Sequence, residues 1–280
     1  MMDILITGGK GQLGSELERV FRKDHLVYCW DIEELDFTNS IKTFEKVYNL
    51  NPDLIVHAGA NTDVKGCELD PDNAYLVNWI GTRNIATVAL QLNIPVVYLS
   101  TDYVFDGNKE EPYLEIDRPN PLNVYGKSKL AGEEIIKNLL QKYYIVRTSW
   151  LYSTNGDNFV NTILKLVKNR DCLKVISDQV GTPTYVKDLA WAIAEMIKMP
   201  FYGTYHISNK GQTSWHQLVK AIFEINGVTD IDLKPIKTQE YCQKVKRPAF
   251  SVLENFNLEN TYNLKLRFWR DALEDCLNNY

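Results

Sequence analysis

Tyr125 and Lys129 are the two residues whose types and spacing most directly suggest chemistry. They lie four positions apart at the start of an apolar-periodic run, and residues four apart share one face of a helix. A free phenol has a pKa of about 10, and a neighbouring ammonium favours the phenolate and so lowers that value. The pair therefore suits proton transfer to or from a sugar oxygen, provided that another group delivers a hydride. The same spacing also occurs by chance in exposed helices.

A glycine-rich turn near the N-terminus is a candidate site for the hydride carrier. The apolar run 4–6 predicts a buried parallel strand, and residues 15–21 follow helical spacing. Between them, glycines at 8 or 9, 11 and 14 allow a pyrophosphate to approach a helix N-terminus, where free amides and the helix dipole favour an anion. An ordinary glycine turn is the alternative. We predict that the dinucleotide is bound here by Gly8, Gly11, Gln12, Leu13 and Gly14.

Asp31 ends the next expected strand, 26–30, and lies 17 residues after the last glycine. An acidic residue at about this distance meets the adenosine ribose hydroxyls in dinucleotide-binding folds. No arginine follows that could hold a 2′-phosphate, so NADH is slightly favoured over NADPH, and either remains a candidate. Alternatively, Asp31 only caps the following turn. Further cofactor contacts are expected where the second and third strands end, from Asp36, Phe37, Ala58, Gly59 and Ala60.

Thr101 follows a fourth apolar run, 94–99, at its carboxyl end. Open α/β sheets place their ligands at that edge, so the hydroxyl of Thr101 is expected near the glycine turn. A strand followed by a helix recurs about five times, with one helix expected over 73–92 and a loop over 61–68. This alternation predicts a doubly wound, parallel, Rossmann-type α/β sheet with a smaller α/β cap. We place the dinucleotide-binding domain at 1–150, rejoined by about 185–208, and the substrate-binding cap mainly at 151–280.

Composition narrows the class of protein. The 280 residues carry a net charge of −5, which argues against binding nucleic acid. No apolar stretch approaches the roughly 20 residues of a membrane span, and the N-terminus lacks the features of a signal peptide. Five scattered cysteines, without a Cys-x-x-Cys pair, indicate reduced thiols in a cytoplasmic protein. No Cys/His cluster has metal spacing, so no metal is expected, and the chain is predicted to be a monomer or a homodimer.

The motifs resemble those of the extended short-chain dehydrogenase/reductases, and within them the dTDP-4-dehydrorhamnose reductase family. The matching segments run along nearly the whole chain, at 8–14, 57–64, 100–107, 123–133, 147–150, 178–183 and 247–251. The resemblance implies reduction of the C4 keto group of dTDP-4-dehydro-L-rhamnose by NADH or NADPH. The product, dTDP-L-rhamnose, would serve the synthesis of cell-surface polysaccharide.

The resemblance also implies roles for individual residues. Tyr125 would donate a proton to the forming alkoxide, Lys129 would lower the pKa of Tyr125 and hold the nicotinamide ribose, and Thr101 would polarise the keto oxygen. Substrate contacts are implied for Val64, Thr101, Asp102, Trp150 and Arg247, with the arginine facing the diphosphate.

Other functions remain open on the same motifs. Trp150 could be a core aromatic and Arg247 a surface arginine. Related dehydratases usually have a glutamate after the Thr-Asp pair, where this chain has Tyr103, and this favours simple reduction. Another sugar-nucleotide oxidoreductase or epimerase, or a non-catalytic regulatory subunit of the same fold, are the alternatives.

Overall fold

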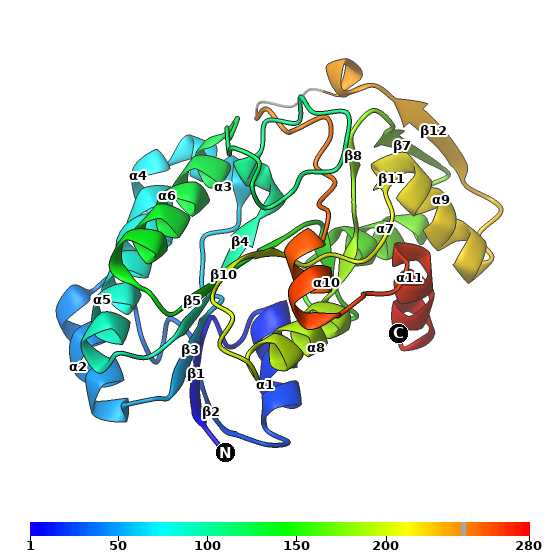
Figure 1. The fold of residues 1–280 in the computed structure, drawn as a ribbon. Coiled ribbons are helices and arrows are strands. Elements are labelled where there is room, and N and C mark those ends of the chain that lie inside the picture. Colours follow the sequence, from blue (N-terminus) through cyan, green and yellow to red (C-terminus); the bar gives the residue numbers. More distant parts are fainter. Residues whose placement is uncertain (242–244) are drawn as a thin grey trace.

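A parallel sheet forms the centre of the computed structural model, which describes residues 1–241 and 245–280 (Figure 1). Cys242 lies outside these residues. Within them, one six-stranded sheet has the order β10-β5-β4-β3-β1-β2, with all neighbours parallel. Its strands are β1 (Asp3–Thr7), β2 (Leu26–Trp30), β3 (Leu54–His57), β4 (Val96–Thr101), β5 (Tyr143–Thr148) and β10 (Gly203–His206). The order reverses beside β1, which confirms the doubly wound sheet and puts a ligand site at its carboxyl edge.

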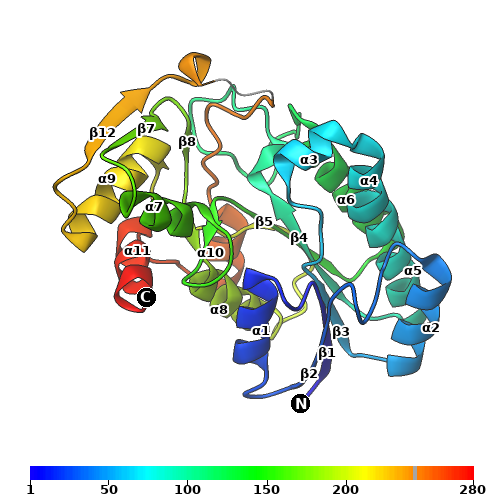
Figure 2. The same ribbon diagram turned by 180° about the vertical axis from the view of Figure 1, so that it is seen from behind.

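Helices cover both faces of this sheet (Figures 1 and 2). Side chains alternate along a strand, so Ile4 and Ile6 of β1 pack on one side and Leu5 on the other. The first side is covered by α1 (Gln12–Phe21) and α8 (Val186–Met196). The second is covered by α2 (Ser40–Leu50), α5 (Thr82–Leu92) and α6 (Val124–Leu139).

Two expected segments differ from the prediction. The expected loop 61–68 is wrong in part, because Asp63 accepts a hydrogen bond from the Lys65 amide at 3.1 Å and starts helix α3 (Val64–Leu69). The expected helix 73–92 begins earlier, as α4 (Pro71–Tyr75), and passes through a π-helical turn (Leu76–Gly81) before α5. That turn brings Gly81 against the ring of Phe37, where an added Cβ would lie 2.4 Å from a ring carbon.

A second hydrophobic core lies in the cap. The strands β7 (Cys172–Ile176) and β12 (Asp232–Ile236) pair in parallel there. Helices α7 (Phe159–Val167), α9 (Trp215–Asn226) and α11 (Trp269–Asn278) pack around them. The remaining elements are β6 (Leu151–Tyr152), β8 (Val180–Gly181), β9 (Thr184–Tyr185), β11 (Thr213–Ser214), α10 (Phe256–Tyr262) and two 3₁₀ turns (Asp102–Val104 and Thr238–Glu240).

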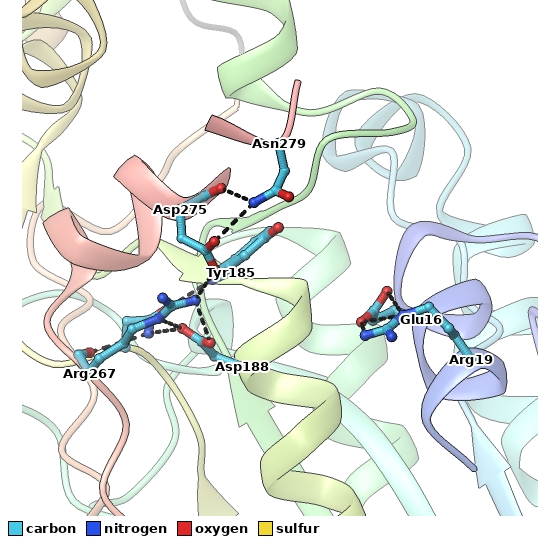
Figure 3. A network of polar contacts seen from close by, with 8 residues as sticks. Glu16, Arg19, Tyr185, Asp188, Arg267, Asp275 and Asn279 are labelled. Carbon is cyan, nitrogen blue, oxygen red and sulfur yellow. Dashed lines mark hydrogen bonds and ion pairs between the residues drawn. The ribbon is translucent and has the colours of Figure 1, made fainter. Parts of the chain in front are cut away.

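Polar contacts tie the end of the chain to the main unit. Arg267 donates to both carboxylate oxygens of Asp188 on α8 at 2.9 Å, and to Asp275 on α11 at 2.7 Å (Figure 3). Strand β10 and helix α8 both belong to the central sheet unit, as does Leu258 of α10. The chain therefore crosses between the two units more than once, and the boundary at residue 150 stays a prediction. In the described part of the chain, no helix is long and apolar enough to cross a membrane.

Candidate active site

A cavity of about 1070 Å³ lies at the carboxyl edge of the sheet and extends to the cap. Every residue that the sequence predicted for catalysis, cofactor or substrate lines it. These are Gly8, Gly11, Gln12, Leu13, Gly14, Asp31, Asp36, Phe37, Ala58, Gly59, Ala60, Val64, Thr101, Asp102, Tyr125, Lys129, Trp150 and Arg247. The structure thus brings the predicted residues together, while their individual roles remain predictions.

The predicted catalytic side chains come from the end of β4 and the start of α6. Thr101 is the last residue of β4. Asn123 caps α6 by accepting a hydrogen bond from the Gly126 amide at 2.9 Å, and its own amide donates to Lys246 O at 2.9 Å. This cap fixes the first turn of α6, which carries Tyr125 and leads to Lys129.

The ionisation of Tyr125 differs from the expectation. Burial raises the pKa of Tyr125 above its usual value, and a hydrogen bond with Thr101 only partly offsets this effect. Lys129 was expected to lower that pKa, but the ammonium is itself disfavoured, since burial lowers the pKa of Lys129 to about 7 against the opposing charge of Glu133. The Lys129 amine lies 4.2 Å from the ring centre of Tyr98. Tyr125 is consequently a neutral phenol at pH 7, the form that can donate a proton.

Asp102 is a buried carboxyl group on the same edge. One of its oxygens accepts a hydrogen bond from the Thr101 hydroxyl at 3.1 Å. The other has no hydrogen-bond partner within residues 1–241 and 245–280. Burial raises the pKa of Asp102 to about 7. Asp102 lines the cavity and a buried oxygen without a partner is uncommon in folded proteins, so this carboxyl group is a candidate hydrogen-bond partner for a ligand.

The glycine turn forms a close-fitting cradle at the N-terminus of α1. Gly8 has φ +69°, and a Cβ there would lie 2.7 Å from the backbone of Gly59. A Cβ at Gly14 would lie 2.2 Å from Gly8 O. Gly11 is the N-cap of α1 and has no side chain to accept a hydrogen bond. The amides of the first turn of α1 are therefore not capped by a side chain. Backbone this close, with free amides, fits the pyrophosphate of a dinucleotide.

Asp31 is linked to the glycine turn itself. Its carboxylate accepts hydrogen bonds from the backbone amides of Lys10 and Ile32, each at 2.9 Å. The contact to Ile32 matches the alternative reading of a turn cap, although Asp31 also lines the cavity. The amine of Lys10 pairs with Glu33 beside it. Sequence reasoning missed Lys10, a cation inside the glycine motif that lies next to the predicted ribose position.

Tyr103 and Arg247 form a second polar link across the cavity. The ring of Tyr103 meets that of Tyr125 edge-on, with centroids 5.9 Å apart. Burial raises the pKa of Tyr103 to about 12, against the opposing charge of Arg247 and a hydrogen bond with it. Arg247 is half-buried and lines the cavity, which favours the predicted site residue over a free surface arginine, while its role stays a prediction.

The cap contributes aromatic rings that the sequence analysis missed. Trp215 and Phe159, the first residues of α9 and α7, line the cavity beside Trp150. Their only signal in the sequence was an aromatic residue directly after a polar helix cap, Ser214 or Asn158. Among the described residues, no group of three or more His, Cys, Asp or Glu side chains could hold a metal ion.

Comparison with known proteins gives full-length matches. A family model described as the RmlD substrate binding domain matches residues 2–280. The spore coat polysaccharide biosynthesis protein SpsK of Bacillus subtilis (strain 168) is 39% identical, over 99% of this chain and 97% of SpsK. A dTDP-4-dehydrorhamnose reductase of Clostridium acetobutylicum ATCC 824 superposes with a TM-score of 0.96 at 41% identity, covering 99% of each chain. The reductase of Bacillus anthracis str. Ames, solved in complex with NADP, has a TM-score of 0.96 and 39% identity, covering 100% of this chain and 99% of the other.

Proposed function

Because the chain belongs to the dTDP-4-dehydrorhamnose reductase family, we propose that it is an NAD(P)H-dependent oxidoreductase that reduces the C4 keto group of dTDP-4-dehydro-L-rhamnose. The product is dTDP-L-rhamnose, a precursor for cell-surface polysaccharide. The observation that carries this proposal is that a phenol, a hydroxyl and an amine share one cavity with a glycine cradle suited to a dinucleotide.

When bound, the nicotinamide supplies the hydride that adds to C4 of the sugar. Tyr125 donates its proton to the oxygen that gains charge as the hydride arrives. The single O–H of Thr101 donates to Asp102 in the structure; turned to the same substrate oxygen, it would stabilise the developing charge. Burial raises the pKa of Tyr125 and so favours the protonated phenol that this direction of reaction requires.

The remaining residues bind and orient. The amides of the glycine turn hold the pyrophosphate, and Asp31 meets the adenosine ribose. Lys129 holds the nicotinamide ribose, and Asp36, Phe37 and residues 58–60 line the rest of the cofactor site. On the substrate side, Asp102 accepts a hydrogen bond from a sugar hydroxyl and Arg247 pairs with the diphosphate. Val64 and Trp150 contact the hexose.

A coupled absorbance assay tests the reaction. Purified protein is given dTDP-4-dehydro-L-rhamnose with NADH or with NADPH, and the loss of the reduced nicotinamide absorbance is followed. Consumption with either cofactor, together with formation of dTDP-L-rhamnose, supports the proposal. Folded protein that consumes neither cofactor would be incompatible with it.

Location and assembly are part of the same proposal. The four cysteines that the structure describes are free thiols, which supports a cytoplasmic location. The assembly is proposed to be a monomer or a homodimer, two states that sedimentation velocity distinguishes.

A further inference from the structure

Three aromatic rings meet along the cap side of the cavity, and two of them, from Trp150 and Trp215, are stacked. The indoles of Trp150 and Trp215 have centroids 3.4 Å apart, and their planes are within 5° of parallel. The ring of Phe159 lies 4.4 Å from that of Trp215. All three side chains are only half-buried and line the cavity. The three rings therefore give the cap side of the cavity an apolar lining.

Trp150 is held in an unusual backbone conformation. Its φ is +46°, in the left-handed region that bulky side chains rarely adopt. Residues keep such strain only where their surroundings over-determine it, and they cluster at functional sites. Here the preceding Ser149 donates its hydroxyl to Thr182 O at 2.7 Å, and Trp150 O accepts from the Thr184 amide at 3.2 Å.

Gly181 gives the indole of Trp150 the space it needs. A Cβ at Gly181, on β8, would lie 2.5 Å from a carbon of that indole and 2.7 Å from its nitrogen. The indole is thus confined by the backbone of Gly181 and by the ring of Trp215. Neither residue lies near the glycine turn in the sequence, and neither contributes an ionisable group.

We propose that Trp215 and Gly181 are positioning residues, which hold the indole of Trp150 as a fixed wall for the hexose of the nucleotide sugar. Thr148, two residues before Trp150, pairs with Thr101 across β4 and β5. The wall therefore begins beside the predicted catalytic hydroxyls. A 6-deoxyhexose carries a methyl group and an apolar ring face, and both suit an indole surface. This inference rests on the proposed function.

Four variants test the positioning role. Trp215→Ala and Gly181→Ala should raise KM for dTDP-4-dehydro-L-rhamnose roughly two- to thirteen-fold, the range expected for losing one aromatic contact, with a smaller change in kcat and an unchanged KM for NADH. Trp215→Phe should restore most of the affinity, because it keeps a ring in the stack. Trp191→Ala is the matched control, since Trp191 is an exposed tryptophan on α8 outside the cavity.

A binding measurement separates this role from general damage. Calorimetric titration of wild type with dTDP and with dTDP-L-rhamnose should show tighter binding of the sugar-bearing ligand. That preference should shrink toward one in Trp215→Ala, while dTDP alone binds as before.

Two results overturn the inference while leaving the proposed reaction standing. One is an active wild type with an unchanged preference in Trp215→Ala. The other is an equal loss of NADH and sugar-nucleotide binding in that variant. A wild type that binds neither nucleotide and consumes no cofactor would instead overturn the proposed function, and the inference with it. If Gly181→Ala does not fold, the variants Trp215→Ala and Trp215→Phe still test the positioning role.

Discussion

The ion pair between Glu133 and Arg147 gives the sharpest prediction for stability. Glu133 lies on α6 and Arg147 on β5, and their side chains are 0% and 1% exposed. Glu133 accepts hydrogen bonds from Arg147 Nε at 2.9 Å, from Arg147 Nη2 at 2.7 Å and from Ser100 Oγ at 2.6 Å. Glu133→Gln keeps the shape but leaves the arginine charge buried without its counter-charge. Breaking such a pair costs about 3–5 kcal/mol of the free energy of unfolding.

Urea denaturation measures this cost, and the chain offers a matched control. Glu134 is the next residue on α6, is half exposed and pairs with Lys137 at 3.4 Å. Glu134→Gln should change the free energy of unfolding by only about 0–1 kcal/mol. Replacing both partners, as in Glu133→Leu with Arg147→Met, should recover much of the loss, because the arginine charge is then removed together with its partner. Equal effects of Glu133→Gln and Glu134→Gln would refute the reasoning.

The pH dependence provides a second check on this pair. Burial opposes the ionisation of Glu133, but the charge of Arg147 outweighs it and holds the pKa of Glu133 below its usual value. A lowered folded-state pKa means that the stabilisation is complete above the unfolded value of about 4.3 and is lost as pH falls through the folded value. The difference between wild type and Glu133→Gln should therefore stay constant near neutral pH and shrink only in acid.

Three further predictions concern the proposed reaction. Tyr125→Phe should bind NADH normally but lose about 10²–10⁴-fold in turnover, measured by NADH consumption, because the proton donor is gone; full activity would remove Tyr125 from its role. Lys129→Met should also lose turnover, yet it should unfold at no lower urea concentration at pH 7. Burial lowers the pKa of Lys129 to about 7, so the contribution of Lys129 to the free energy of unfolding is lost as pH falls from the usual pKa of 10.5 toward 7. A clear loss of stability would contradict this sign. Asp31→Ala should raise KM for NADH more than KM for NADPH, because a ribose acceptor is lost while repulsion of a 2′-phosphate is relieved; equal changes would place Asp31 away from the ribose.

The sheet and the cofactor edge were predictable because their determinants are local. The apolar run before Gly8, the glycine spacing and the strand ending at Thr101 each fix a position within a few residues, and parallel strands then bring their ends together. The helix after Asn61 was missed, since its start depends on one capping carboxylate, Asp63, in a polar stretch that also reads as a loop.

The ionisation states and the aromatic stack could not be predicted in the same way. The direction in which the pKa of Tyr125 shifts depends on how completely the fold buries Tyr125 and Lys129. The spacing of the two residues in the sequence does not reveal this burial. The contact of Trp150 with Trp215 joins residues 65 positions apart in the sequence and depends on how the cap is placed.

The position of β10 at the edge of the sheet has a consequence for synthesis on the ribosome. Strand β5 is complete at Thr148, but its partner β10 and the helix α8 end only at His206 and Met196. At about 5–20 residues per second, the nascent sheet waits roughly 3–12 seconds with β5 unpaired on its outer side and one face uncovered by α8. An unpaired edge is a template for wrong association. A chain shortened after residue 150 is therefore expected to aggregate rather than to yield a separate cofactor-binding unit.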